Sequence, residues 1–137
     1  MPEPPPARGL LDTSVVIDLD RIDPARLPDE PAISAITLAE LAAGPHATTD
    51  QDERARRQDR VQRIEFGIEP LPFDDSCARA YGRVYAATVG AGRKLRPRVL
   101  DLQIAATAIA AALPLYTGDA DDFCHPDALL EVIALDG

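Results

Sequence analysis

The sequence contains no tryptophan, and aromatic residues make up only 4 % of its 137 residues. Without large rings the core must be packed from Leu, Ile, Val and Ala, and apolar residues, at 46 %, are numerous enough for this. No apolar run approaches the roughly 18 residues of a membrane-spanning helix. A chain of this length can bury a core without disulfides, so the sequence predicts one globular domain.

Cysteine and histidine are also scarce. Cys77 and Cys124 lack the spacing of a metal site, and isolated cysteines in a cytosolic protein are usually free thiols. His46 and His125 each adjoin a proline in an expected loop, where a catalytic role is not favoured. The first residues, MPEPPPARG, are rich in proline and lack the apolar segment of a secretory signal. We therefore expect residues 1–7 to be a disordered lead-in and the protein to be cytoplasmic.

Positive charge is limited and local. The net charge is −9, which argues against a simple nucleic-acid-binding protein. Nevertheless the segment GRKLRPR, residues 92–98, carries four positive charges and no acid. Residues 53–65 carry five arginines with three acids between them, which is more typical of a solvated helix face with ion pairs.

The hydrophobic pattern alternates between short strands and helices. Apolar runs predict strands at residues 8–11, 32–36, 68–73, 115–117 and 129–135. Helical spacing predicts helices at residues 14–22, 37–43, 48–66, 74–92 and 99–113. Thr37 is a plausible N-cap of the second helix, and Ala78, Tyr81, Tyr85 and Val89 recur at helical spacing in the fourth. This alternation predicts an α/β fold with a mainly parallel sheet.

Four acidic residues occur where carboxylates are unusual. Asp12 ends the first strand and Asp119 follows the strand at residues 115–117, so both should face the crevice at the carboxyl ends of the strands. Glu40 and Asp101 interrupt helices that are otherwise apolar. A buried carboxylate is costly unless it is paired or bound to a metal.

Each of these acids also has a purely structural explanation. Asp12 could cap a helix, Glu40 could complete a capping box with Thr37, and Asp101 could favour the first-turn dipole of its helix. The acidic stretch GDADD could be a polar turn. The four together favour a site for Mg²⁺ or Mn²⁺, which prefer oxygen ligands. One or two such ions can drive phosphodiester hydrolysis without a side-chain nucleophile.

Four motifs, LLDTSVVID, ISAITLAELAAG, DLQIAATAIA and LYTGDADDF, resemble in this order the motifs of PIN-domain ribonucleases. The closest resemblance is to the VapC toxins of bacterial type II toxin–antitoxin systems, particularly the actinobacterial ones. The resemblance extends from about residue 8 to residue 135. It implies a PIN-like three-layer α/β fold, in which helices flank a short, mainly parallel central sheet, with a single PIN domain at residues 8–137.

The resemblance also implies the site residues. Asp12, Glu40 and Asp101 match the three most regular acidic positions of the family. Asp119 is our choice for the fourth metal-facing acid, with Asp122 in reserve. Many relatives have Asn at the position of Asp119 and Arg at that of Gly118, so this chain departs from the family there. Hydroxyl groups at matching positions should orient carboxylates or waters, namely those of Thr13, Ser14 and Thr117.

The activity implied is that of a Mg²⁺- or Mn²⁺-dependent endoribonuclease that cuts structured RNA, such as tRNA or ribosomal RNA, and stops translation. The family resemblance further implies a homodimer and a VapB antitoxin, which blocks the site within a larger toxin–antitoxin assembly. RNA would be held by the positive charges of the 92–98 segment, namely Arg93, Lys94, Arg96 and Arg98. The arginines of residues 53–65 are a second candidate.

Three alternatives remain open from the sequence. The chain could be a catalytically idle PIN-fold protein that only titrates the antitoxin. It could be a receiver module phosphorylated at Asp12, although such modules need a well-placed lysine and Lys94 is the only one in the chain. It could also be a DNA-directed or flap nuclease, although the chain is short for the clamps that such enzymes carry.

Overall fold

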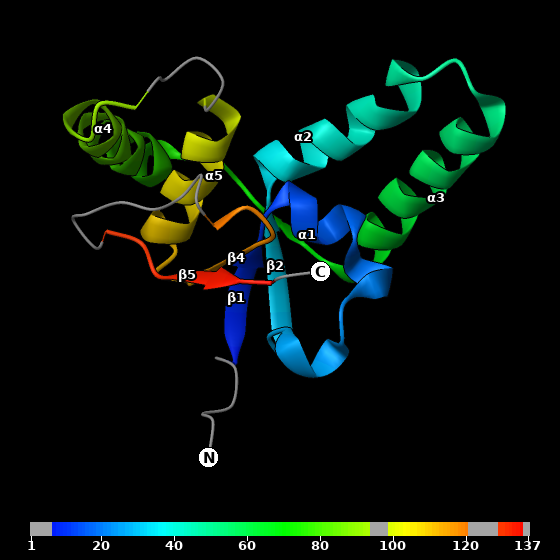
Figure 1. Cartoon of the computed structure of the whole chain (residues 1–137), viewed down its shortest axis with the longest axis horizontal. Coiled ribbons are helices and arrows are strands. Elements are labelled where there is room, and N and C mark those ends of the chain that lie inside the picture. The colour runs from blue at the N-terminus through cyan, green and yellow to red at the C-terminus, as the bar shows by residue number, and fades with distance from the viewer. Residues whose placement is uncertain (1–6, 94–98, 121–128, 136–137) are drawn as a thin grey trace.

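The computed structural model describes residues 7–93, 99–120 and 129–135. Within these ranges five strands form one sheet in the order β3-β2-β1-β4-β5, and every neighbouring pair is parallel (Figure 1). The strands are β1 (Arg8–Leu11), β2 (Glu30–Ser34), β3 (Pro70–Leu71), β4 (Leu115–Thr117) and β5 (Val132–Ala134). The predicted α/β class with a mainly parallel sheet is therefore confirmed.

Helices connect these strands. They are α1 (Thr13–Ile17), α2 (Ala35–Ala43), α3 (Gln51–Gly67), α4 (Asp75–Gly90) and α5 (Val99–Ala110). Short 3₁₀ turns follow α1 and α2, at Leu19–Arg21, Pro24–Arg26 and Gly44–Ala47. Figure 1 shows α4 and α5 together on one side, and α2 and α3 as a projecting pair on the other. Among the described residues, no helix combines the length and the apolar character needed to cross a membrane.

The sheet has a separate core on each face. Because side chains alternate along a strand, Leu10 and Leu115 contact one core and their neighbours Leu11 and Tyr116 contact the other. The first core is completed by residues of α4 and α5, including Val84 and three residues of α5: Leu102, Ile104 and Ala105. The second is completed by residues of α1, α2 and α3: Val15, Val16, Leu41, Val61 and Ile64. The observed architecture is thus three layers, as predicted.

The start of α2 differs from the prediction. The strand predicted at residues 32–36 ends at Ser34, whose hydroxyl caps the helix by accepting the Thr37 amide at 3.0 Å. Thr37 therefore lies inside the helix and is fully buried. The predicted capping box between Thr37 and Glu40 is wrong, because the helix begins three residues earlier with a different cap. This removes the purely structural explanation offered for Glu40.

The buried face of α4 also differs from the prediction. Tyr85 and Val89, expected in the core, are 43 % and 52 % exposed, and Ala78 is exposed as well. The helix instead buries a face of smaller residues, namely Cys77, Ala80, Val84, Ala87 and Thr88. Two helices approach closely only where their contacting side chains are small, and α5 presents buried alanines. Cys77 is a free thiol, as expected, and Cys124 lies outside the described residues.

Candidate functional site

The strand order creates one topological switch point at the centre of the sheet. The chain adds β2 and β3 on one side of β1 and then returns to add β4 and β5 on the other side, so the switch point lies between β1 and β4. Ligands of open α/β sheets bind at such a switch point, outside the carboxyl ends of the strands. Asp12 directly follows β1, and Gly118 and Asp119 directly follow β4. The polar residues predicted for the site therefore lie at the expected edge of the sheet.

Asp12 is held by three hydrogen bonds and is only 4 % exposed. Its Oδ1 accepts the Val15 amide at 3.1 Å and the Ser14 hydroxyl at 2.6 Å. Its Oδ2 accepts the hydroxyl of Thr117, which reaches across from the end of β4. Asp12 is thus the N-cap of α1, and it is also the acceptor that joins the ends of β1 and β4.

The charge of Asp12 is poorly compensated. Burial raises the pKa of this carboxyl, the bonds from Ser14, Thr117 and Val15 lower it, and the nearby Asp119 carboxylate raises it again. None of the groups that shift this pKa is a cation. A bound cation would supply the missing positive charge and reverse the local field.

Without a metal, this raised pKa should make the folded protein less stable as pH rises. The pKa lies above the ordinary value of 3.8 in the folded state, so between these two pKa values the folded protein binds more protons than the unfolded chain does. Stability should therefore fall as pH rises through this interval. Denaturant unfolding in EDTA over this range should show the fall in the wild type and a smaller one in Asp12→Asn. If the stability of the two proteins depended on pH in the same way, the raised pKa would not belong to Asp12.

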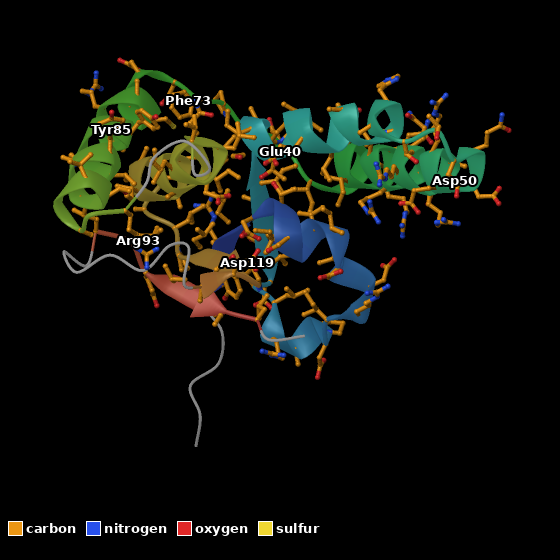
Figure 2. All side chains as sticks on the ribbon, turned by 45° about the horizontal axis from the view of Figure 1, so that its top comes forward. Glu40, Asp50, Phe73, Tyr85, Arg93 and Asp119 are labelled. Atoms are coloured by element: carbon orange, nitrogen blue, oxygen red, sulfur yellow. The ribbon has the colours of Figure 1, made fainter. Side chains whose placement is uncertain are left out.

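Glu40 is positioned by a second set of hydroxyls. It lies half-buried on α2, and its Oε1 accepts the hydroxyl of Thr13, at the start of α1, at 2.8 Å. The Thr13 and Thr37 hydroxyl oxygens are 3.1 Å apart, and Thr37 lies 3.3 Å from the Ser34 hydroxyl. Figure 2 shows Glu40 near the centre of the molecule, on α2. The hydroxyl network therefore fixes Glu40 on the side of α1 opposite β4.

The segment after β4 is tied to α1. The Gly118 amide donates to the Ser14 hydroxyl at 3.1 Å, and the Asp119 amide donates to the Thr117 hydroxyl at 3.0 Å. Asp119 itself is exposed. Ser14 and Thr117 thus each contact both Asp12 and the segment that carries Asp119. The predicted orienting hydroxyls are all in contact with the predicted acids or their backbone.

Asp101 lies half-buried in the first turn of α5. Together the acids lie on α2 and α5 and at the ends of β1 and β4. Within the described ranges no three acidic, histidine or cysteine side chains are close enough to hold a metal ion. The carboxylates therefore do not form a closed cluster in this structure, although the negative charge of Asp119 contributes to the raised pKa of Asp12.

The donor set nevertheless suits a hard cation. Carboxylate and hydroxyl oxygens surround the switch point, and in the described part of the chain neither His46 nor Cys77 is bonded to them. Oxygen donors of this kind fit Mg²⁺ or Mn²⁺ rather than zinc. The residues that could hold such an ion are Asp12, Glu40, Asp101 and Asp119.

Some of the predicted site residues lie outside the described part of the chain. Asp122 and three of the four predicted RNA-binding residues, Lys94, Arg96 and Arg98, lie outside the described residues. Arg93 follows α4, where its amide donates to the Thr88 carbonyl at 3.1 Å. Figure 2 shows Arg93 well to one side of Glu40 and Asp119.

Two cavities flank α1. One, of about 320 Å³, is lined by Thr13 and Glu40 together with Arg57 and Arg60 of α3. The other, of about 380 Å³, is lined by Ser14 and Asp119 together with Arg21. In the sequence, Arg57 and Arg60 belong to the same arginine-rich segment as the other arginines of α3. Their spacing to the buried Val61 and Ile64 places them toward the buried face of α3, because residues three, four and seven apart share one helix face, but Arg54 shares this spacing, so the sequence alone does not single them out.

The chain is similar in sequence to known proteins of a single family. The profile described as PIN domain matches residues 9–129. The chain is 40 % identical to ribonuclease VapC5 of Mycobacterium tuberculosis over 130 residues, covering 93 % of each protein. It is 35 % identical to ribonuclease VapC4 of the same organism over 131 residues, covering 93 % of this chain and 97 % of VapC4.

A solved structure is also similar. The crystal structure of VapBC-5 from Mycobacterium tuberculosis, a member of the VapBC family of toxin–antitoxin systems, contains a chain with 40 % sequence identity and a TM-score of 0.84. The match covers 95 % of this chain and 100 % of that one. The similarity therefore extends over both the sheet and the helices that surround the switch point.

Proposed function

The chain belongs to the PIN-domain family and, within it, to the VapC ribonucleases, and from this premise we propose that it is a metal-dependent endoribonuclease toxin. Its substrate would be structured RNA, such as tRNA or ribosomal RNA, and its effect would be to stop translation in the cytoplasm. The observation that carries the proposal is the buried Asp12 carboxylate, held by three hydrogen bonds at the switch point without a cationic partner among the groups that shift its pKa.

The metal-holding residues in this proposal are Asp12, Glu40, Asp101 and Asp119. A bound Mg²⁺ or Mn²⁺ would supply Lewis acidity and a water of lowered pKa for attack on a phosphodiester. Ser14 and Thr117 orient the Asp12 carboxylate through one bond to each of its oxygens. Thr13 holds Oε1 of Glu40, which would leave Oε2 to bind the ion or to position a water.

A VapB antitoxin would be the natural partner. The similar structure from Mycobacterium tuberculosis is that of a member of the VapBC family of toxin–antitoxin systems, and the match covers the whole of the chain compared. We propose that this protein forms a homodimer and a larger assembly with its antitoxin. An arginine inserted among the carboxylates would neutralise them, because its planar fork of donors matches carboxylate oxygens.

Cleavage of total bacterial RNA tests the proposal. The purified protein, free of antitoxin, would be incubated with total bacterial RNA in the presence of Mg²⁺, Mn²⁺ or EDTA. Parallel reactions under the same three conditions would contain single-stranded DNA instead of RNA. We expect discrete RNA fragments that require the metal, and intact DNA. A folded protein that produces no fragments with either ion would support the idle antitoxin-binding alternative, and preferential cleavage of DNA would support a DNA-directed nuclease.

A further inference from the structure

The 320 Å³ cavity beside α1 has two chemically different walls. One wall carries Thr13 and Glu40, which are bonded to each other and belong to the candidate site. The other carries Arg57 and Arg60, which come from the projecting helix α3. A ligand in this cavity would therefore contact both the acidic site and two guanidinium groups.

Arg57 is fixed in place. Its Nε donates to Glu53 Oε1 at 3.0 Å, and its Nη1 donates to the Gly44 carbonyl, beyond the end of α2, at 2.9 Å. The second oxygen of Glu53 accepts Arg56 at 2.7 Å. Glu53 is thus neutralised by two arginines, so the Arg57 wall of the cavity carries no net negative charge.

Arg60 differs from the other arginines of α3. Arg56, Arg57 and Arg63 form ion pairs with acids on the same helix. Arg54 donates to two backbone carbonyls. Arg60 is half-buried, and in the described part of the chain it has neither a hydrogen bond nor an ion pair. A partly desolvated guanidinium without an anion is a ready binding group for one.

The side chain of Arg60 also has an apolar support. It lines a neighbouring cavity of about 190 Å³ together with Ile17 and Ile64, and the acid that also lines this cavity, Asp20, is paired with Arg63 at 3.7 Å. Arginine stems commonly lie along apolar surface while the charged head remains in a polar space. Arg60 therefore lines both cavities on this side of α1.

We propose that the cavity between α1 and α3 binds a phosphate of the RNA strand next to the one that is cut, with Arg60 as its main contact and Arg57 as a fixed neighbour. This rests on the proposed function. Guanidinium groups bind phosphate in a bidentate manner, and such contacts hold a strand in register without reading its sequence. The Thr13–Glu40 wall makes this cavity continuous with the proposed reaction site, which favours substrate over an acidic segment of a partner protein.

RNA affinity tests this site separately from catalysis. Arg60→Met removes the charge and keeps the apolar stem, and Arg60→Lys keeps the charge and loses the fork. Binding of fluorescently labelled bulk bacterial tRNA would be measured by anisotropy in EDTA, over a series of salt concentrations. We expect Arg60→Met to weaken binding roughly tenfold and to reduce the salt slope by about 0.7 to 0.9, as for one lost phosphate contact. Arg60→Lys should keep the slope and lose part of the affinity.

Arg83→Ala is the matched control. Arg83 lies exposed on α4, lines neither cavity, and like Arg60 has no bonded partner among the described residues. Its loss should change tRNA affinity less than twofold. In cleavage assays with metal, Arg60→Met should raise KM and leave kcat within about twofold, because a phosphate held away from the reacting bond contributes uniform binding. Melting curves would show that each variant is folded.

The possible failures are distinguishable. Arg60→Met and Arg83→Ala with equal tRNA affinity would overturn the phosphate site, and so would a wild type that binds no tRNA. Unchanged tRNA affinity with weakened antitoxin binding would also overturn it and assign Arg60 to the partner protein. If the wild type binds tRNA but never cleaves RNA, and Arg60→Met loses the tRNA binding, the results would support the phosphate site and contradict the proposed activity.

Discussion

Asp12→Asn is expected to reduce RNA cleavage at least about a thousandfold while the protein stays folded, which corresponds to roughly 4 kcal/mol of lost transition-state stabilisation. Asn caps helices as well as Asp does, so the bond from the Val15 amide can persist. The Thr117 hydroxyl can accept from the new amide group instead of donating. What the variant loses is the negative charge, which a bound cation requires. Metal-dependent cleavage kinetics and melting curves would measure both effects.

Asp74→Asn is the matched control for this change. Asp74 caps α4 as Asp12 caps α1, with its carboxylate accepting the Cys77 amide at 3.0 Å. It is exposed and precedes a helix on the opposite side of the molecule from α3 (Figure 1). The Asp74→Asn variant should cleave RNA as fast as the wild type. Undiminished cleavage by Asp12→Asn as well would mean that Asp12 is only a helix cap.

Gly9→Ala is expected to destabilise the fold by about 1–3 kcal/mol. Gly9 lies buried in β1, and an added Cβ would lie 2.8 Å from Cδ1 of the Tyr116 ring and closer still to Cε1. Tyr116 is fully buried on the neighbouring strand β4, so its ring has no open space into which to move. Either the two strands must separate or the ring must leave the core. Urea unfolding monitored by circular dichroism would measure the loss.

Gly82→Ala adds the same methyl group where nothing lies within 4 Å. Gly82 is exposed in the interior of α4, where alanine favours the helix, so this variant should gain about 0.5–1 kcal/mol. If Gly9→Ala were as stable as the wild type, the close packing of β1 against Tyr116 would be wrong. If both variants were less stable than the wild type by the same amount, the destabilisation would not be specific to the contact between β1 and Tyr116.

The sequence predicted the features that depend on local pattern. The limits of β1 and β4 were correct because each is a short segment that is followed at once by a residue unfavourable in strands, Asp12 or Gly118. The parallel arrangement followed from alternating strands and helices, and it brought Asp12 and Asp119 to one edge. The ion pairs of α3 followed from the alternating charges of residues 53–65.

Features that depend on packing could not be predicted in this way. Ser34 and Thr37 are both suitable N-caps, and the choice was set by where β2 ends beside β1 and β3. The face of α4 that is buried has smaller side chains than the exposed face, because α5 packs closely there. Arg60 stands apart from the other arginines of α3 only when its missing partner and the cavity beside Glu40 are seen together.

The central claim is that carboxylates from separate elements hold a divalent cation at the carboxyl end of the sheet. Isothermal titration calorimetry of MnCl₂ into the antitoxin-free protein tests it most directly, with Asp101→Asn and Asp74→Asn titrated in parallel. We expect the wild type and Asp74→Asn to bind Mn²⁺ alike and Asp101→Asn to lose most of this binding. Equal Mn²⁺ binding by the wild type and Asp101→Asn, or none by the folded wild type, would contradict the claim.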